Sequence, residues 1–381
     1  MVGNKGAVAV SFSFGATNIA FVCCHLAARS ERKVKRNTMY HDIYRQLHLG
    51  KKSKFSSFDI SFRFDHLFWM GDLNYRLDCE YSEVLSRIRS KEYSALLNYD
   101  QLKTEQGHGK VLRKFKEGTI AFPPTYRYER GARGTYVYEK VKATGNVYNV
   151  PSYTDRVLLH SLPHLGHTQT GYFSNLFLSS SDHAPVLATY ILDAKPQYVA
   201  ASKYSPQLED FLKIRFPIIQ AKIKLSTPDK LCLKFVSCLL EGSPMSKPVP
   251  RIVADYNEDL KLSSPSLCSL SKCDVSSWEC GELPELDPIL RKMEYIANEY
   301  IFVQAVSCGN DSVCYGQGIL SLKDKIKSDS IHSFNIVLTL NDEICGEIRG
   351  KVCFSRNPAR EANLTFSDQL ANPHIPSVIN L

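Results

Sequence analysis

The sequence lacks several features that would place it in large classes of protein. No run of about 18 apolar residues occurs in its 381 residues, so it contains no segment of the length that a helix needs to span a membrane. Its first residues do not show the positively charged segment and apolar core of a secretory signal. These absences favour a cytoplasmic protein.

Paired cysteine spacings are also missing, although the sequence contains 12 cysteines. Cys23 and Cys24 are adjacent in an apolar stretch, where neighbouring side chains of a strand point to opposite faces. Cys268, Cys273 and Cys280 lack the two-residue spacing and the clustered histidines of zinc sites. The pattern favours reduced thiols in a cytosolic protein over a zinc site.

Positive charge is concentrated in the first half of the sequence. Residues 1–200 contain 27 Lys and Arg against 17 Asp and Glu, whereas residues 201–381 contain 20 against 22. This distribution predicts an anionic substrate and attraction to an anionic membrane surface. Charge alone would also suit nucleic acid, but the basic and aromatic repeats of nucleic-acid modules are absent.

The stretch Phe68–Leu77 organises the first half. The apolar run Leu67–Met70 ends at Gly71, and Asp72 and Asn74 follow two residues apart. This is the pattern of a buried strand that delivers polar side chains on one face at its end. A carboxylate and an amide together can orient a water and hold an oxyanion. The same pair also occurs in Asx turns that close strands.

Four further polar sites lie at the boundaries of predicted strands. They are Cys24–Leu26 after Asn18–Cys23, then Pro124–Tyr128, Pro151–Leu158, and Ser180–Val186 before Val186–Leu192. Each is a weak signal by itself. Five polar sites at strand ends predict a single catalytic rim.

Taken in order, these motifs resemble the inositol polyphosphate 5-phosphatases of the DNase I-like superfamily. The motifs are GNKGAVAVSF (Gly3–Phe12), HLAA (His25–Ala28), WMGDLNYRL (Trp69–Leu77), PTYRYER (Pro124–Arg130), KATG (Lys142–Gly145), PSYTDRVL (Pro151–Leu158) and SDHAPV (Ser181–Val186). The long Asp72 motif separates this group from the superfamily's nucleases and sphingomyelinases. PTYRYER and KATG look most like the branch that bears Src-homology domains and acts on phosphatidylinositol 3,4,5-trisphosphate.

The resemblance implies magnesium-assisted hydrolysis of a phosphate monoester by direct attack of water. It implies five catalytic residues, namely Asp72, Asn74, His183, Asp155 and His25. Asp72 would orient or deprotonate the water, and Asn74 would hold phosphoryl oxygens. His183 would stabilise charge on the phosphate, with its ring held by Asp155, and His25 would bind the phosphate from the other side.

The resemblance also implies residues that bind the substrate and the metal. Tyr126, Arg127 and Lys142 are expected to grip the phosphates that are not cleaved, and Arg156 is expected to bind substrate as well. Asp182 is expected to support the magnesium site. A headgroup with several phosphates suits a fork-shaped arginine and a point-charge lysine.

The expected fold class is α+β, with two domains. Residues 1–195 are expected to form a DNase I-like four-layer α/β/β/α sandwich without its first part, and residues 196–212 read as a linker. Residues 213–356 show short alternating strands that predict an all-β sandwich similar to the C-two lipid-binding type. Within it, Ile296–Ser307 is predicted as a strand and Asp255–Glu282 as an irregular loop. Residues 357–381 are predicted to be a flexible tail.

The sequence departs from the family pattern at a few places. Gly3–Gly6 opens directly into a hairpin predicted for Ala7–Phe14 and Ile19–Cys24. No segment matches the family's earlier strands, which carry an Asn and a metal-binding Glu, so we expect an N-terminally incomplete domain. Arg29 stands where the family usually has Gly, and Tyr153-Thr154 where it usually has Trp-Cys.

The functional prediction is removal of the 5-phosphate from phosphoinositides in phosphoinositide signalling, with phosphatidylinositol 3,4,5-trisphosphate as the first candidate. The expected partners are a phosphoinositide headgroup at an anionic membrane and protein adaptors bound by segments absent here, not nucleic acid. One alternative is a catalytically silent fragment that binds phosphoinositides or membranes. Another is a nuclease of the same superfamily, which the long Asp72 motif, Arg127 and Lys142 argue against.

Overall fold

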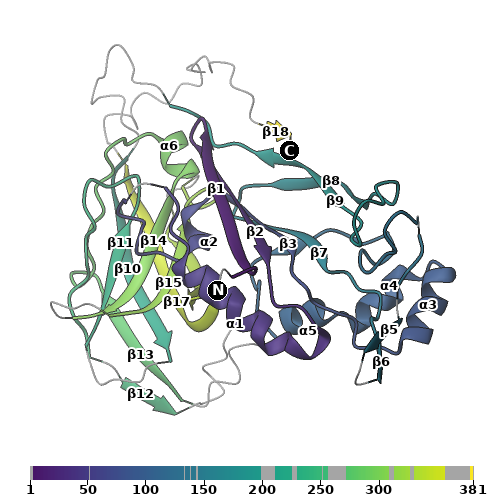
Figure 1. The fold of residues 1–381 in the computed structure, drawn as a ribbon. Coiled ribbons are helices and arrows are strands. Elements are labelled where there is room, and N and C mark those ends of the chain that lie inside the picture. Colours follow the sequence, from purple (N-terminus) through teal and green to yellow (C-terminus); the bar gives the residue numbers. More distant parts are fainter. Residues whose placement is uncertain are drawn as a thin grey trace. The chain divides into compact units, whose positions relative to one another are not determined.

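A computed structural model describes residues 3–50, 52–132, 134–137, 139–142, 145–198, 211–224, 230–250, 252–255, 272–308, 313–326, 330–356 and 378–380. The chain divides into two compact units (Figure 1). The first comprises Met1–Lys51, Ile60–Lys195 and Pro376–Leu381, and the second comprises Lys52–Asp59 and Pro196–Ile375. The division after Lys195 falls where the sequence predicts the end of the catalytic domain, whereas the assignment of Lys52–Asp59 to the second unit has no counterpart in that prediction.

The first unit contains a five-stranded sheet in the order β1-β2-β3-β7-β4. Its strands are β1 (Gly6–Phe14), β2 (Thr17–His25), β3 (His66–Asp72), β7 (Asp155–Ser161) and β4 (Lys116–Glu117). The β2–β3 pair is parallel, and the other pairs are antiparallel. The predicted hairpin is confirmed by β1 and β2, with Gly6 opposite His25 at its open end.

A second sheet and several helices complete this unit. The sheet has the order β18-β9-β8, formed by β8 (His167–Ser174), β9 (Val186–Asp193) and β18 (Val378–Asn380), and β5 (Glu139–Lys142) pairs with β6 (Gly145–Tyr148). The helices are α1 (Lys33–Gln46), α2 (Ile60–Arg63), α3 (Tyr81–Arg89), α4 (Tyr93–Leu96) and α5 (Gln101–Gly107), with 3-10 turns at Ser30–Arg32 and Leu97–Tyr99. No helix in the described residues is long and apolar enough to cross a membrane.

Strand β3 is buried on both faces, which explains why its sequence is an apolar run rather than an alternation. On one face Trp69 packs against Tyr40 of α1, with ring centroids 4.9 Å apart. On the other face Phe68 packs against Phe21 of β2 at 4.6 Å and Tyr190 of β9 at 5.3 Å. A helix therefore covers one face of the sheet and a second sheet covers the other, as expected for a layered sandwich.

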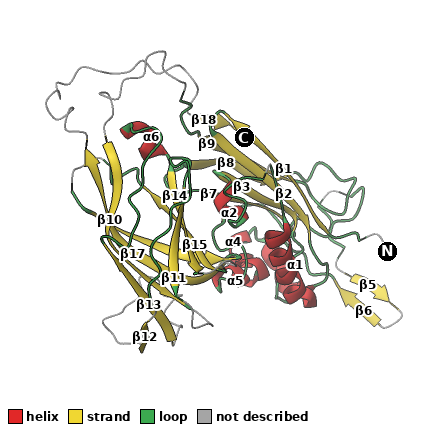
Figure 2. Cartoon of the chain, turned by 90° about the vertical axis from the view of Figure 1, so that its left-hand side faces the viewer, coloured by secondary structure: helices red, strands yellow, loops and turns green. Residues whose placement is uncertain are grey.

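The second unit is built around an eight-stranded antiparallel sheet in the order β11-β14-β15-β16-β17-β10-β13-β12. Its strands are β10 (Phe211–Ile223), β11 (Leu231–Val236), β12 (Ile252–Asp255), β13 (Lys272–Glu279), β14 (Tyr300–Ser307), β15 (Cys314–Ser321), β16 (His332–Leu340) and β17 (Glu343–Arg356). Helix α6 (Met293–Asn298) directly precedes β14 and lies at one end of these strands (Figure 2). The strands share an apolar core in which Phe216 stacks on Phe235.

Several predictions for the second half are corrected. The strand predicted for Ile296–Ser307 begins only at Tyr300, because its first residues belong to α6. The irregular loop predicted for Asp255–Glu282 contains β13, in which Ser276 and Trp278 are buried at alternate positions. Of the predicted flexible tail, only Val378–Asn380 is described, and it pairs with β9.

Cysteine pairing differs from the expectation of reduced thiols. Cys232 of β11 forms a disulfide with Cys308, which follows β14. These two strands are neighbours in the sheet, with Leu231 opposite Ser307. The disulfide therefore joins adjacent strands of the second unit.

Gly71 occupies a position that only glycine suits. Its φ is +116°, and a Cβ would lie 2.2 Å from the carbonyl oxygen of Cys24 in β2. We expect Gly71→Ala to destabilise the first unit by roughly 2 kcal/mol or more, because β3 must move away from β2. The two tryptophans are Trp69 in the first unit and Trp278 in the second, so urea unfolding followed by fluorescence in a Trp278→Phe background reports on the first unit.

The matched control is Gly107→Ala at the end of α5, where a Cβ would meet nothing within 4 Å. Its urea midpoint should stay the same or rise slightly, since alanine favours helix. An unchanged midpoint for Gly71→Ala would contradict the tight pairing of β2 and β3.

Candidate active site

The site is assembled by the register of three neighbouring strands. The β2–β3 pairing places His25 opposite Asp72, and the β3–β7 pairing places Asp72 opposite Asp155. A backbone bridge joins Tyr126 to His183. The structure thus places His25, Asp72 and Asp155 in a row across the end of one sheet. A hydrogen bond connects His183 to Asp155, and the backbone bridge brings Tyr126 beside His183.

The Asp72 carboxylate lies among charged groups. Its Oδ2 is 3.2 Å from Nε2 of His25, whose side chain is about half exposed, and Nζ of Lys5 also contacts that nitrogen. Burial raises the pKa of Asp72 and the negative charge of Asp155 raises it further, while the nearby histidines act in the opposite direction. A raised pKa makes this carboxylate a stronger base than a free aspartate, which suits proton abstraction from a water.

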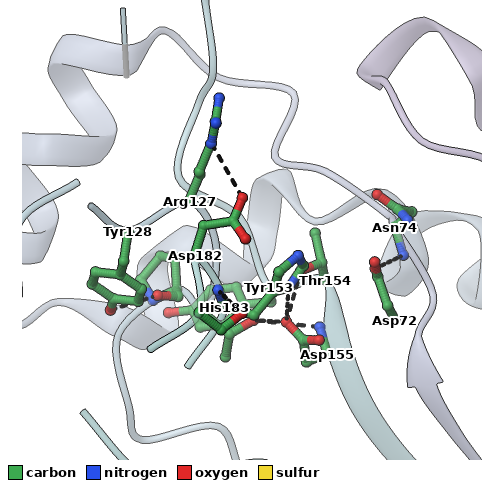
Figure 3. Close-up of polar contacts among 12 residues, drawn as sticks. Asp72, Asn74, Arg127, Tyr128, Tyr153, Thr154, Asp155, Asp182 and His183 are labelled. Atoms are coloured by element: carbon green, nitrogen blue, oxygen red, sulfur yellow. Dashed lines mark hydrogen bonds and ion pairs between the residues drawn. The ribbon is translucent and has the colours of Figure 1, made fainter. Parts of the chain in front are cut away.

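Asp155 holds the ring of His183. Oδ2 of Asp155 accepts hydrogen bonds from Nδ1 of His183 at 2.9 Å and from the hydroxyls of Thr125 and Thr154 at 2.7 and 2.8 Å (Figure 3). Burial lowers the pKa of His183, but the hydrogen bond to Asp155 and the neighbouring carboxylates outweigh it, so the pKa is raised. The ring therefore favours its charged form, which suits stabilisation of negative charge.

Asn74 is buried and fixed from several sides. Its backbone N–H donates to Oδ1 of Asp72 at 3.0 Å, so the motif also forms the Asx turn that the sequence left open. Its φ of +57° is in the left-handed region, which asparagine tolerates. Its Nδ2 donates to the carbonyl oxygen of Leu26 at 3.1 Å, and its Oδ1 accepts from Arg76 at 2.6 Å. An amide nitrogen carries two hydrogens, so the bond to Leu26 leaves one for a phosphoryl oxygen.

Arg76 and Lys5 also belong to this cluster, although neither was predicted as a site residue from the sequence. The Arg76 guanidinium is bonded to Asn74 and lies over the ring of Tyr126, 4.6 Å from its centroid. The Tyr126 ring in turn packs against the ring of His183 at 4.5 Å. Arg76 therefore connects the amide of Asn74 to the aromatic wall beside His183. Arg76 lies in the motif WMGDLNYRL and Lys5 in the motif GNKGAVAVSF. Their positions in these motifs could have identified them as site residues.

Asp182 is paired with two arginines. Its Oδ2 is 3.3 Å from Nε of Arg127, and its Oδ1 is 3.3 Å from Nη2 of Arg130. Figure 3 marks the ion pair with Arg127. Burial raises the pKa of Asp182, but hydrogen bonds from its own backbone and Arg130 outweigh it, so the pKa is lowered. A carboxylate neutralised by two arginines does not fit the expected role in a magnesium site. Lys142 ends β5, and its side chain lies outside the described residues.

Arg156 lies in the core, which corrects the expectation that it binds substrate. Its side chain has no exposed surface. Nε and Nη2 donate to the carboxylate of Glu117 at 2.6 and 2.7 Å, and Nη1 donates to Asp100 at 3.0 Å. Burial raises the pKa of Glu117, but Arg156 and Lys103 outweigh it and lower the value to about 2. A guanidinium bonded to two buried carboxylates is not available to a phosphate.

The described residues include no group of three or more His, Cys, Asp or Glu side chains arranged to hold a metal ion. Asp72 and Asp155 nevertheless lie opposite each other on β3 and β7, and the charge of Asp155 raises the pKa of Asp72. A cation between them would offset this repulsion. These two carboxylates fit part of a magnesium site, because Mg²⁺ prefers one or two carboxylates with water and phosphate oxygens.

Family models match both units. Residues 1–189 match the endonuclease/exonuclease/phosphatase family 2, and residues 229–351 match the SHIP1/2 second C2 domain. The phosphatidylinositol 3,4,5-trisphosphate 5-phosphatase 2A of Danio rerio is 40% identical over 92% of this chain and 26% of its own length. The phosphatidylinositol 3,4,5-trisphosphate 5-phosphatase 2 of Homo sapiens is 38% identical over the same shares. This chain therefore spans about a quarter of the length of these relatives.

A solved structure of the inositol polyphosphate 5-phosphatase domain of spSynaptojanin is also similar. It is 34% identical, and the match covers 50% of this chain and 50% of that chain. The TM-score is 0.41.

We expect Arg156→Met to destabilise the first unit by roughly 3–5 kcal/mol, because two carboxylates would stay buried without their counter-charge. Urea unfolding in the Trp278→Phe background measures this loss. The control is Arg87→Met, which removes a partly exposed pair with Glu83 and should change the urea midpoint far less. If Arg156→Met lost little stability but bound substrate much more weakly, the prediction that Arg156 binds substrate would be correct.

We expect Asp155→Asn to lower the pKa of His183, because the hydrogen bond to the Asp155 carboxylate favours the charged ring and burial then dominates. In the unchanged protein the folded pKa is raised, so protonated His183 contributes stability below its ordinary pKa of 6.5, and this contribution is lost as pH rises through the folded value. An NMR titration of the ring, assigned with His183→Gln, should give a midpoint above 6.5 that falls below it in Asp155→Asn.

Thr125→Val provides the matched control, because it removes one hydrogen bond to Asp155 and leaves the carboxylate charge in place. Its midpoint should lie near that of the unchanged protein. Equal midpoints for all three proteins would show that Asp155 does not set the charge of His183.

Proposed function

Because this chain belongs over residues 1–189 to the endonuclease/exonuclease/phosphatase family 2, we propose that it removes the 5-phosphate from phosphoinositides. The first candidate substrate is phosphatidylinositol 3,4,5-trisphosphate, which the names of its relatives contain. The observation that carries the proposal is the cluster of His25, Asp72, Asp155 and His183 at the end of one sheet. This chain spans about a quarter of the length of those relatives, and we propose the same activity for the whole protein.

In the proposed reaction, Asp72 accepts the proton of the attacking water and His183 stabilises the charge that develops on the phosphate. The raised pKa of His183 favours its role, because stabilising charge on the phosphate needs a charged ring. Lys5, which contacts Nε2 of His25, adds positive charge beside Asp72. No covalent enzyme intermediate is required, and the side chains act by positioning and charge neutralisation.

The headgroup is proposed to lie against Tyr126 and Arg127. Tyr126 provides a ring face that Arg76 and His183 hold in place. Arg127 is about one-third exposed, and its guanidinium offers further donors to phosphates that are not cleaved. Asn74 and Lys142 are proposed as the other phosphate ligands, as the motif resemblance implies.

A divalent cation is proposed to bind at Asp72 and Asp155, with magnesium as the first candidate. When bound, it supplies charge neutralisation of the phosphate oxygens. Asp182 is left out of this set because its carboxylate is paired with Arg127 and Arg130.

We also propose that the protein is cytoplasmic and recruited to anionic membranes. The match of residues 229–351 to a C2 domain model and the positive charge of residues 1–200 support this location. Protein adaptors are proposed to bind segments outside this chain.

A second candidate is a phosphoinositide-binding module without catalysis. One observation favours it, namely that no group of three or more metal-binding side chains occurs in the described parts of the chain. The pairing of Asp182 with arginines points in the same direction.

The test is phosphate release from vesicles that contain phosphatidylinositol 3,4,5-trisphosphate, with magnesium, by this chain and by a version extended upstream. We expect activity that EDTA removes and that Asp72→Asn lowers by roughly 100-fold or more, because the base is lost. Asn keeps the shape of the side chain and its Oδ1 acceptor. The control is Asp42→Asn, an exposed carboxylate of α1 that is paired with Arg45.

If neither version of the chain released phosphate but both still bound vesicles, the protein would be a binding module and not a phosphatase. Cleavage of abasic DNA instead of lipid would favour a nuclease. Activity in the extended version alone would assign the chemistry to a larger domain that includes these residues.

A further inference from the structure

Arg76 is a buried cation to which the proposed reaction assigns no chemical step. The residue is 8% exposed, and among the side chains that the structure describes no carboxylate forms an ion pair with its guanidinium. Arg156, by contrast, is bonded to the carboxylates of Asp100 and Glu117. A buried guanidinium without a counter-charge is costly unless other groups satisfy its donors. The contacts of Arg76 therefore indicate its role.

The guanidinium of Arg76 holds the amide of Asn74 in one orientation. Its Nη2 donates to Oδ1 of Asn74 at 2.6 Å, and its Nε donates to the backbone carbonyl oxygen of the same residue at 3.2 Å. On the other side, Nδ2 of Asn74 donates to the carbonyl oxygen of Leu26 at 3.1 Å. If the amide turned over, its NH2 group would face the guanidinium and both sets of bonds would be lost.

The flat face of the same guanidinium holds the ring of Tyr126. The guanidinium carbon lies 4.6 Å from the centroid of that ring, and the ring packs against His183 at 4.5 Å. A planar guanidinium can stack on an aromatic ring while its edge donates hydrogen bonds. Arg76 therefore connects the amide proposed to bind phosphoryl oxygens with the ring against which the headgroup is proposed to lie.

Gln101, the first residue of α5, fixes the backbone from which the Arg76 side chain extends. Its Oε1 accepts from the backbone N–H of Arg76 at 3.0 Å, and its own N–H donates to the carbonyl oxygen of Arg76 at 2.9 Å. The Nε2 of Gln101 donates to Oδ1 of Asp78 at 2.7 Å and to the carbonyl oxygen of Ser30 at 3.2 Å. Both backbone polar groups of Arg76 are thus bonded to one buried residue, which restricts where its side chain can point.

We propose that Arg76 is a positioning residue that keeps an N–H of Asn74 directed at the phosphoryl oxygens and the Tyr126 ring directed at the headgroup. This inference rests on the proposed function. Arg76 acts through these two residues and not on the reacting atoms. Without it the amide turns over in part of the molecules, and its oxygen then faces the phosphate and repels it. Loss of Arg76 should therefore slow turnover through Asn74 and weaken headgroup binding through Tyr126.

The first test measures phosphate release from soluble inositol 1,3,4,5-tetrakisphosphate with magnesium, by this chain and by the version extended upstream. Arg76→Met should lower kcat by roughly 10-fold or more and raise KM several-fold. Arg76→Lys keeps the charge but lacks the fork of donors and the flat face, so it should resemble Arg76→Met. The matched control is Arg113→Met, which removes a partly buried guanidinium bonded to the carbonyl oxygen of Gly109 and should change neither constant.

Double variants separate positioning from general support of the fold. In an Asn74→Ala protein, adding Arg76→Met should lower kcat by less than about twofold, because no amide is left to hold. In a Tyr126→Leu protein, adding Arg76→Met should raise KM by less than about twofold for the same reason. A substitution that only destabilises the fold would instead multiply the losses in both backgrounds.

A second measurement reports the position of Asn74 without catalysis. Hydrogen exchange of its side-chain amide, assigned by NMR with Asn74→Ala, should become roughly 10-fold faster in Arg76→Met. The reference in the same spectra is the backbone N–H of Leu26, which donates to the carbonyl oxygen of Asp72 at 3.0 Å and should keep its exchange rate.

The outcomes divide clearly. Full activity of Arg76→Lys would overturn the inference, because charge alone would then suffice. Losses that multiply in the double variants, or equal acceleration of exchange at Leu26, would show a general structural role and also overturn it. If neither chain length released phosphate, the proposed phosphatase would fail, and faster exchange confined to Asn74 would still support the positioning by Arg76.

Discussion

The pairing of β3 with β2 on one side and β7 on the other is the constraint on which the site depends. It sets His25, Asp72 and Asp155 in one row, although they come from distant parts of the sequence. A shift of one residue in either pairing would turn every side chain of β3 to the opposite face. Trp69 and Phe68 prevent that shift, because each fills a different apolar layer. The core that stabilises the unit is thus also the device that aligns its polar residues.

Two groups of charged residues in the first unit differ in their electrostatic balance. Arg156, Asp100 and Glu117 are fully buried, and the guanidinium is bonded to both carboxylates. Asp72 and Asp155 face each other with a repulsion that raises the pKa of Asp72. The first group is electrostatically satisfied and supports the fold, whereas the second keeps an imbalance that a substrate or cation can relieve. Such imbalance is characteristic of functional sites.

The sequence allowed the motifs at strand ends to be grouped, and it located the hairpin and the buried strand. The burial of Arg156 could also have been predicted from the sequence, because adjacent residues of a strand point to opposite faces. With Asp155 at the site, Arg156 must face the core. The pairing of Asp182 with Arg127 and Arg130 had no such local signal, since it depends on two segments meeting in space. In the second unit, a Ser-rich composition concealed the buried alternation of β13.

The loop after His25 shows how a departure from the family pattern is accommodated. Arg29 stands where the family usually has glycine, and its φ of +81° is strained for a residue with a side chain, at a cost of about 1–3 kcal/mol. Buried Arg36 of α1 donates to the carbonyl oxygens of Ala27, Arg29 and Ser30 at 3.1, 2.6 and 3.2 Å. These charge-assisted hydrogen bonds fix the backbone at these three residues. The loop that follows His25 is therefore held by a buried guanidinium, which offsets the strain that glycine would have avoided.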